Sequence, residues 1–518
     1  MKMDKHITAP VKIISITLCL ALFIANCGSQ NDAGTRVGNP PTVSTTSAFP
    51  ASLAIASPLE NSDSLSELPA LLRYTTTEGR SAYEEAVDRI NTILEGDSLS
   101  ACNFDPSHLL QHSGNAQCYG PNVAYANHPD TLPGQQTSGT LPPGDLGLWA
   151  EYDEQTGQAC AADQLNLRMR GMQFKTQSSL EALASLLCVA SVNSIELPES
   201  GSVDLTEEMV EMSASNNIAA TFTSAELSVA TNEDDTVSYS YELNFSFTDD
   251  DGAHDVIVRM THVALSDEGD YKGRFSYVVE DADAVQNNCP TDGITHAGSI
   301  LYAKSAEADL DILGNEGGFC GQDIDPVQSN GLIDPNDAYD GDSNTDGWGL
   351  NFSTFVANTN TETLAGNYSL VWQAGPQDDN TRAFNVALNA SEDPLSGTAF
   401  FGYGDPISET DGSITGFICN WAGPGGSHAM QDFVQRQSLE ENADGLFDSV
   451  SADLAIGYAP TNSCDYDGQG TFSYDLDPDM NATDMSDPAL AVANDLLDLT
   501  DTTFTDAGFT LPIAPENF

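Results

Sequence analysis

Basic residues are scarce in this sequence. Its 518 residues include 16 lysines and arginines but 78 aspartates and glutamates, so the formal net charge at pH 7 is −62. Proteins that bind DNA, RNA or an anionic membrane face need a basic surface, and this composition therefore excludes such partners. An acidic surface with almost no lysine is typical of proteins that face brine or seawater, where salt screens the repulsion between like charges. A surface that binds divalent cations broadly is the alternative interpretation.

Several catalytic motifs are also absent. The sequence contains no CxxC pair, no HExxH and no GxSxG. It therefore gives no support for a thiol oxidoreductase, a zinc protease of that type or a serine hydrolase with a nucleophile elbow. His108 and His112 in "HLLQH" have a spacing that can hold zinc on a helix, although loop histidines are the simpler interpretation. Glycoside hydrolysis needs two carboxylates at a defined separation, and 78 acidic residues offer many pairs that only a structure can place.

The N-terminus has the parts of a secretory signal peptide. Lys2, Lys5 and Lys12 precede or border the uncharged apolar stretch "IISITLCLALFIA" at 13–25. This stretch is shorter than the roughly 20 apolar residues that span a bilayer. We therefore expect a cleaved signal and not a membrane helix.

The end of this stretch, "IANC", resembles the lipobox of bacterial lipoproteins, with aliphatic Ile24, a small residue and then Cys27. Asn26 departs from the Gly, Ala or Ser that usually precedes the lipidated cysteine. The resemblance implies a lipoprotein signal peptide at 1–26 and acylation of Cys27. Gly28 in the next position implies transport to the outer membrane, where several acyl chains hold a protein stably. A secreted protein with an unmodified cysteine is the alternative.

Residues 27–65 are rich in Gly, Ser, Thr, Asn and Pro. A stretch of that composition buries too little apolar surface to fold, so we expect a flexible tether behind the anchor. Within it, "GTRVGNP" resembles a segment that follows the lipidated cysteine in lipoproteins of marine and sediment bacteria. "CYGPNVAYANHPD" and "GFICNWAGPGG" resemble other parts of the same family, which brings no known activity.

Cysteine usage agrees with export. Beyond Cys19 and Cys27, eight cysteines remain, and an even count in an exported chain indicates disulfides. They are Cys102, Cys118, Cys160, Cys188, Cys289, Cys320, Cys419 and Cys464. Their spacing favours the local pairs Cys102–Cys118, Cys160–Cys188, Cys289–Cys320 and Cys419–Cys464 among the 105 possible pairings. Free buried thiols are the alternative, with Cys188 in "LASLLCVAS" the foremost case.

Periodicity divides the remaining chain into two regions and predicts an α+β protein. Residues 66–215 form a helical, disulfide-bearing region, with helices expected over 80–96, 159–172 and 177–191. A further helix is expected to start at Asp204, with Glu207 completing a capping box.

Residues 216–518 alternate apolar and polar side chains, as antiparallel strands joined by hairpins do. The pattern predicts a β-meander that forms a barrel or sandwich, with a loop region at 289–347 and inserted helices at 427–442 and 487–499. Strands are expected over 219–231, 236–248, 254–265, 272–280, 347–358, 366–375, 382–391, 397–405, 412–421, 450–459 and 470–477.

One acidic loop has the spacing of a cation site. In "DGDSNTDGW", Asp342, Asn344 and Asp346 occupy loop positions 1, 3 and 5, and a glycine follows at position 6. This resembles the first half of an EF-hand loop, where alternate oxygens converge on calcium. The acidic residue at position 12 is missing, and Asp340 is the candidate that supplies its charge. A solvated acidic loop is the alternative.

Together these features predict an exported, acidic protein that is held to the outer membrane through an N-terminal lipid. The leading hypothesis is a non-enzymatic binding or scaffold lipoprotein with a protein or glycan partner. A hydrolase that acts on an extracellular polymer and a calcium-dependent adhesion module are the alternatives.

The charge predicts that the fold is stabilised by salt. Cleavage after residue 26 leaves 77 acidic and 13 basic residues, so the mature chain has a formal charge of −64. Raising NaCl from 0.1 M to 1 M shortens the Debye length from about 10 Å to about 3 Å and screens their repulsion. We expect the thermal midpoint to rise by several degrees, as measured by a melt at both salt concentrations. A flat midpoint, with sucrose as the control for solute exclusion, would contradict this prediction.

Overall fold

The computed structural model describes the chain from residue 45 to residue 473, with gaps. The described ranges are 45–60, 81–111, 124–125, 139–140, 160–249, 252–265, 269–281, 294–305, 309–320, 349–374, 381–389, 394–404, 434–443, 445–449, 455–458, 465–466 and 472–473. Cys27 and the 340–346 loop lie outside these ranges, as do the strand expected at 412–421 and the helix expected at 487–499.

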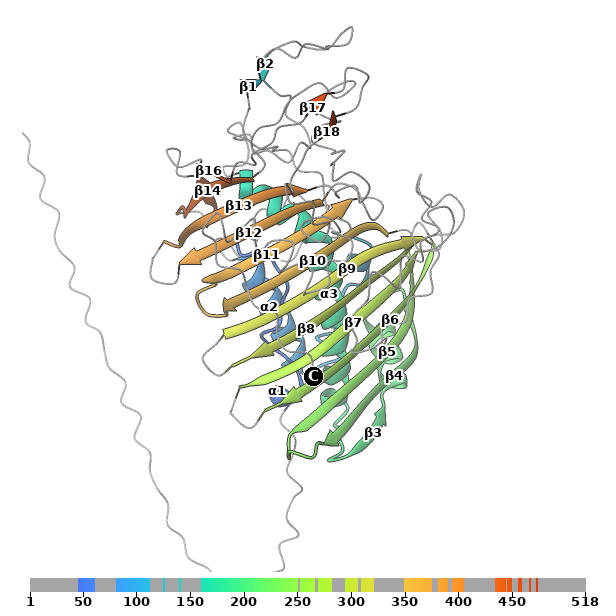
Figure 1. The fold of residues 1–518 in the computed structure, drawn as a ribbon. Helices are drawn as coiled ribbons and strands as arrows, with labels where there is room; N and C mark the ends of the chain where they lie inside the picture. The colour runs from blue at the N-terminus through green and yellow to red at the C-terminus, as the bar shows by residue number, and fades with distance from the viewer. Residues whose placement is uncertain are drawn as a thin grey trace, which may run out of the picture. The chain divides into compact units, whose positions relative to one another are not determined.

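A single 14-stranded sheet dominates the described residues (Figure 1). Its strands pair in sequence order from β3 to β15, each antiparallel to the next, and β16 pairs with β14. The strands are β3 Gly201–Asp204, β4 Ala220–Thr231, β5 Val237–Thr248, β6 Ala253–Ala264, β7 Tyr271–Asp281, β8 Ile294–Lys304, β9 Asp309–Cys320, β10 Gly349–Asn360, β11 Gly366–Ala374, β12 Thr381–Asn389, β13 Ser396–Gly404, β14 Val434–Glu441, β15 Phe447–Ser449 and β16 Ala455–Tyr458. Four short strands form two separate pairs, β1 Ala124–Tyr125 with β2 Gly139–Thr140 and β17 Asp465–Tyr466 with β18 Phe472–Ser473.

The predicted α+β class and the antiparallel meander are confirmed. The prediction of a barrel or sandwich is not met among the described strands, because the two ends of the path, β3 and β15, do not pair with each other. Helices, and not a second large sheet, cover one face of the open sheet (Figure 1).

Period-2 alternation explains why the strands form. In β5, the side chains of Tyr239, Tyr241, Leu243, Phe245 and Phe247 are buried, and the residues between them are exposed or intermediate. Successive side chains of a strand point to opposite faces, so one face of β5 is apolar and packs toward the helices. The other face carries serine, asparagine and glutamate.

The helices are α1 Thr45–Ala48, α2 Ala82–Leu94, the 3-10 helix η3 Pro106–Leu110, α3 Cys160–Val192 and α4 Thr206–Asn216. The helix expected over 80–96 is confirmed as α2, which begins with a capping box between Ser81 and Glu84. The capping box expected at Asp204 is wrong, because the N-cap of α4 is Leu205, which has no side-chain cap bond. The Asp204 carboxylate instead accepts hydrogen bonds from the backbone and hydroxyl of Thr206.

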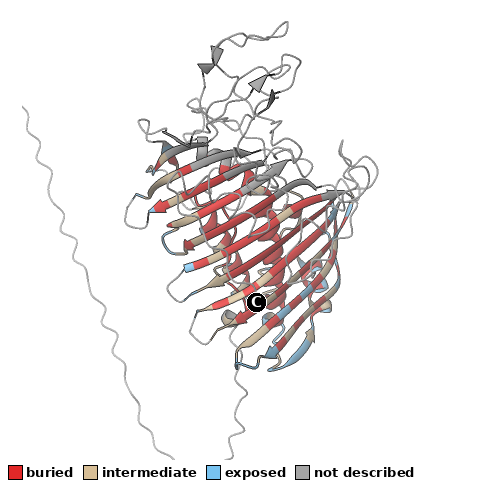
Figure 2. Cartoon of the chain, viewed as in Figure 1, coloured by how far each residue is buried: buried red, intermediate tan, exposed pale blue. Residues whose placement is uncertain are grey.

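The two helices expected at 159–172 and 177–191 are one helix, α3, of 33 residues. Residues 171–190 are buried without exception, whereas an amphipathic surface helix exposes one side (Figure 2). Helix α3 packs against β7, β11 and β13 of the sheet and also against α2, η3 and α4. No helix within the described ranges is long and apolar enough to cross a membrane.

Residues 47–60, here called the N-terminal strap, are part of the hydrophobic core. The flexible tether predicted for 27–65 is therefore wrong over the strap, where Phe49, Leu53 and Ile55 are at most 2% exposed. The hydroxyls of Tyr83 and Tyr241 donate to backbone carbonyls of the strap, at Ser52 and Ala48. The composition of 27–65 is dominated by small and polar residues, so the few large apolar residues of the strap did not change the prediction.

Two other predictions are wrong in part. The loop region expected at 289–347 contains β8 and β9, which were missed because β8 is buried on both faces and β9 is rich in glycine. The helix expected at 427–442 contains strand β14, because pairing with β13 outweighs the helical period of its apolar residues.

The disulfide in the structure joins Cys102 to Cys188, with a Cα–Cα distance of 5.5 Å. The predicted pairs Cys102–Cys118 and Cys160–Cys188 are therefore wrong, and Cys188 is not a free thiol. Helices α2 and α3 run side by side, so the turn after α2 reaches the end of α3, 86 residues further along the chain. Cys118, Cys289, Cys419 and Cys464 lie outside the described residues, and the side chains of Cys160 and Cys320 are not described.

Two tyrosine rings lie over glycines on the neighbouring strand. Gly273 is paired with Tyr302, and Gly298 with Tyr277, across β7 and β8. A Cβ atom added at either glycine would overlap the opposing ring. Both tyrosines are fully buried, so each ring has little room to move aside.

We predict that Gly298→Ala destabilises the fold by about 1–3 kcal/mol, the usual cost of overpacking a core. Chemical denaturation in 1 M NaCl measures it. The double variant Gly298→Ala/Tyr277→Ala should lose less than the sum of the single variants, because the second change removes the ring that clashes. Additive losses would contradict this explanation.

Candidate functional site

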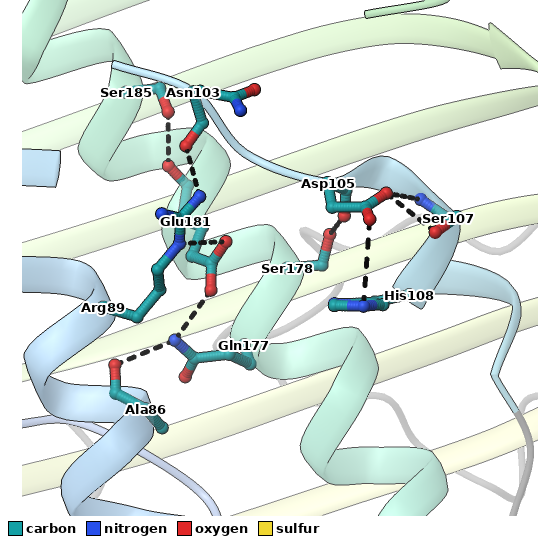
Figure 3. Close-up of polar contacts among 10 residues, drawn as sticks. All are labelled: Ala86, Arg89, Asn103, Asp105, Ser107, His108, Gln177, Ser178, Glu181 and Ser185. Carbon is teal, nitrogen blue, oxygen red and sulfur yellow. Dashed lines mark hydrogen bonds and ion pairs between the residues drawn. The ribbon is translucent and has the colours of Figure 1, made fainter. Parts of the chain in front are cut away.

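A buried polar network joins α2, η3 and α3 (Figure 3). The Glu181 carboxylate is 1% exposed, lies 3.5 Å from Nε of Arg89 and accepts a 3.2 Å hydrogen bond from Gln177. Gln177 also donates to the Ala86 carbonyl, and Arg89 to the carbonyl of Asn103. Burial raises the pKa of the Glu181 carboxyl, and the neighbouring Arg89 guanidinium opposes that rise.

The same network places Asp105, His108 and Ser178 together, which are the residue types of a hydrolytic triad. In a triad the serine hydroxyl donates to the histidine, which the aspartate orients. Here the Ser178 hydroxyl donates to the backbone carbonyl of Asp105 at 2.7 Å, and His108 Nε2 lies 3.9 Å from the Asp105 carboxylate. Ser178 is also fully buried. This arrangement connects η3 to α3 and does not form an activated nucleophile.

A groove of about 240 Å³ lies on the sheet across β4 to β7. Along β4, β5 and β6, the polar residues that line it alternate with buried residues that point toward the helices. The groove therefore lies on the sheet face opposite α3, here called the outer face. Two rows of side chains cross it, and strand register defines them: Glu226, Glu242, Arg259 and Ser276 form one row, and Ser228, Ser240, Thr261 and Arg274 form the other.

The first row already contains an ion pair. Arg259 Nη2 lies 3.1 Å from the Glu242 carboxylate, and its Nη1 donates to the Asn244 side chain at 2.8 Å. Glu226 lies directly opposite Glu242 on β4, and its carboxylate accepts a hydrogen bond from Ser228. Arg259 is therefore fixed by its neighbours, and the β4–β5 side of the groove is acidic.

Arg274 differs from Arg259 because it has no acidic partner. No ion pair or hydrogen bond of its guanidinium group occurs within the described part of the chain, and the residue is only partly buried. Thr261 lies directly opposite it on β6. The β7 side of the groove therefore presents an arginine that is available to a ligand.

The structure brings none of the predicted site residues into this groove. Cys27, Asp340, Asp342, Asn344 and Asp346 lie outside the described residues, so lipidation and calcium binding stay predictions. Within the described ranges, no group of three or more His, Cys, Asp or Glu side chains is placed to hold a metal ion.

Of the zinc candidates, His108 is buried with its ring 5.8 Å from that of Phe174, and His112 is not described.

The groove could not be predicted from the sequence, because its residues come from four strands and meet only through register. One signal was present: "VRM" and "KGR", at 258–260 and 272–274, carry two of the few arginines of the chain on consecutive strands.

Comparison of the chain with protein-family models, curated proteins and solved structures finds no match. The groove and the network are therefore interpreted from their own geometry.

The buried Glu181 predicts a specific pH dependence. Because its folded-state pKa is raised, its contribution to stability is fully present below the unfolded pKa and is lost as pH rises through the folded pKa. Glu181→Gln removes this titration. Relative to the native chain, we expect the free energy of unfolding of the variant to increase between pH 4 and 8, because the variant no longer has to ionise a buried carboxyl group.

Denaturant melts in 1 M NaCl measure this difference at each pH. Glu207→Gln, which removes an exposed carboxylate from α4, controls for the loss of one negative charge. A difference between Glu181→Gln and the native chain that does not change with pH would contradict the prediction.

Proposed function

We propose that this chain is a lipid-anchored envelope protein that binds a small ligand on the outer face of its sheet and does not catalyse a reaction. The observation that carries the proposal is the groove between β4 and β7, which offers both signs of charge and several hydroxyls on one rigid surface. The lipobox pattern at Cys27 supports attachment to the outer membrane.

The scaffold under the groove suits a binding surface. Tyr241 and Phe275, which alternate with groove residues on β5 and β7, are at most 2% exposed and pack in the same core as α3. The strap packs against this core as well. Side chains on packed strands are held more precisely than side chains on loops.

A hydrolase is the second candidate, and one observation favours it. Glu226 and Glu242 face each other across β4 and β5, and retaining glycosidases use two carboxyl groups about 5–5.5 Å apart. One of the two must act as an acid, which requires a desolvated setting. Glu242 is 49% exposed and is ion-paired with Arg259, which suits ligand binding better than proton donation.

The test compares two serine variants on β5. Ser240→Trp fills the groove, and Ser246→Trp adds the same ring to the same face of the strand outside the groove. We expect at least one class in a panel of sugars, sugar acids, amino acids and short peptides to raise the thermal midpoint of the native chain. Ser246→Trp should keep this shift and Ser240→Trp should lose it.

The melts use the detergent-solubilised lipidated chain in 1 M NaCl, and chromatography follows each ligand for cleavage. Absence of any shift, or an equal shift in Ser240→Trp, would contradict binding in the groove. Cleavage that is lost in Glu226→Gln and Glu242→Gln would replace the binding proposal with the hydrolase.

Lipid anchoring predicts a separate result. Expressed with its own signal peptide, the native chain should partition into the detergent phase, because several acyl chains hold a protein stably on a membrane. Cys27→Ala should release it in soluble form. A native chain that is soluble and begins at a residue other than 27 would show that the lipoprotein interpretation is wrong.

A further inference from the structure

We propose that the groove recognises a sugar acid, a hydroxylated ligand that carries one carboxylate, and that Arg274 binds this carboxylate. The inference rests on the proposed binding function and specifies its ligand. It follows from three properties of the groove, which are its available cation, the hydrogen-bonding character of its lining and its size.

The available cation is informative because cations are rare. Acidic residues outnumber basic ones by 77 to 13 in the mature chain, so an arginine without an acidic partner is unexpected. Glu242, an acidic side chain of the same groove, already forms an ion pair with Arg259. The planar fork of an arginine matches a carboxylate with two parallel hydrogen bonds. Arg274 thus provides a site for one oxyanion.

The rest of the lining sets the charge and the polarity of the ligand. Ionised Glu226 and Glu242 only accept hydrogen bonds, whereas Ser228, Ser240 and Thr261 donate or accept. A polyol supplies the hydroxyl donors that these acceptors require. Neighbouring strands are about 4.8 Å apart, so a dianion such as phosphate would meet repulsion from the two glutamates only two to three strands away. A single negative charge at the β7 side meets about half of that repulsion.

The size of the groove limits the ligand to one small unit. Its volume of about 240 Å³ is below the roughly 300–1,000 Å³ that is typical of pockets for drug-sized ligands. The aromatic residues at its base, Tyr241 and Phe275, have buried side chains, so the groove offers no ring for stacking. Recognition therefore depends on hydrogen bonds and on the Arg274 charge.

Three related sugars test this inference by calorimetry with the detergent-solubilised lipidated chain in 1 M NaCl. Galacturonate carries the carboxylate, galactose has a hydroxymethyl group in its place, and galactose 6-sulfate carries a sulfate ester. We expect galacturonate to bind at least tenfold more tightly than galactose, and more tightly than galactose 6-sulfate, whose weakly basic oxygens are poorer hydrogen-bond acceptors. A hydrogen bond to a charged group is strong enough to give a difference of this size.

Variants of Arg274 test whether this residue binds the carboxylate of the ligand. Arg274→Gln should weaken galacturonate binding by about tenfold or more, and Arg274→Lys, which keeps the charge and loses the fork, should be intermediate. Lys272→Gln is the matched control, because Lys272 is on the same face of β7 two residues away and does not line the groove. The thermal midpoint of each variant reports whether it folds.

Three kinds of result would overturn the inference and leave the binding function intact. The first is equal affinity for galactose and galacturonate, or an Arg274→Gln variant that binds galacturonate as the native chain does. The second is no binding of any of the three sugars, while another class of the ligand panel shifts the native chain and not Ser240→Trp. Tighter binding of the sulfate ester would assign the site to sulfated sugars and would likewise overturn the carboxylate.

Discussion

Residues 171–190 of helix α3 are buried without exception, so the charged side chains of this helix need partners from other parts of the chain. A buried charge without a partner costs several kcal/mol, and breaking a buried ion pair is about as costly. The structure supplies these partners from three directions. Glu60 of the strap pairs with Arg170 at 2.8 Å, Glu316 of β9 pairs with Lys175 at 2.7 Å, and α2 supplies the arginine that pairs with Glu181. These contacts connect the strap, the sheet and α2 to one helix.

The same constraint explains how the few basic residues are used. Arg89, Arg170 and Lys175 all pair with carboxylates that are 13% exposed or less. Water solvates a carboxylate on the surface, whereas a buried carboxylate needs a cation, so the scarce cations are most valuable inside. Arg274 is the contrast, because it lies on the outer face without an acidic partner in the part of the chain that the structure describes. This distribution is why we assign that arginine to a ligand and not to the fold.

On β5, the outer face of the sheet differs in polarity from the face that the helices cover. One face of β5 is filled with tyrosine, leucine and phenylalanine that pack in the core, and the other carries serine and glutamate. Along β4 to β6 most residues of the outer face are exposed or partly exposed, so this part of the sheet can carry a site. In this chain the packed core holds two rows of polar side chains in register. Attachment through Cys27 would place this surface in the cell envelope.

The sequence by itself determined those helices and strands whose own residues show a clear hydrophobic period. Alternation predicted β4 to β7 and β10 to β13, and spacing predicted α2, because both properties are local. Tertiary structure decided the rest. The Cys102–Cys188 bond depends on how α2 packs beside α3, and the strap is ordered only because the sheet and helices enclose its few apolar residues. The groove exists only through the register of four strands, which brings Glu226, Glu242, Arg259 and Arg274 together from distant parts of the sequence. Such contacts between distant segments are absent from any local pattern, because packing, and not the neighbouring residues, selects them.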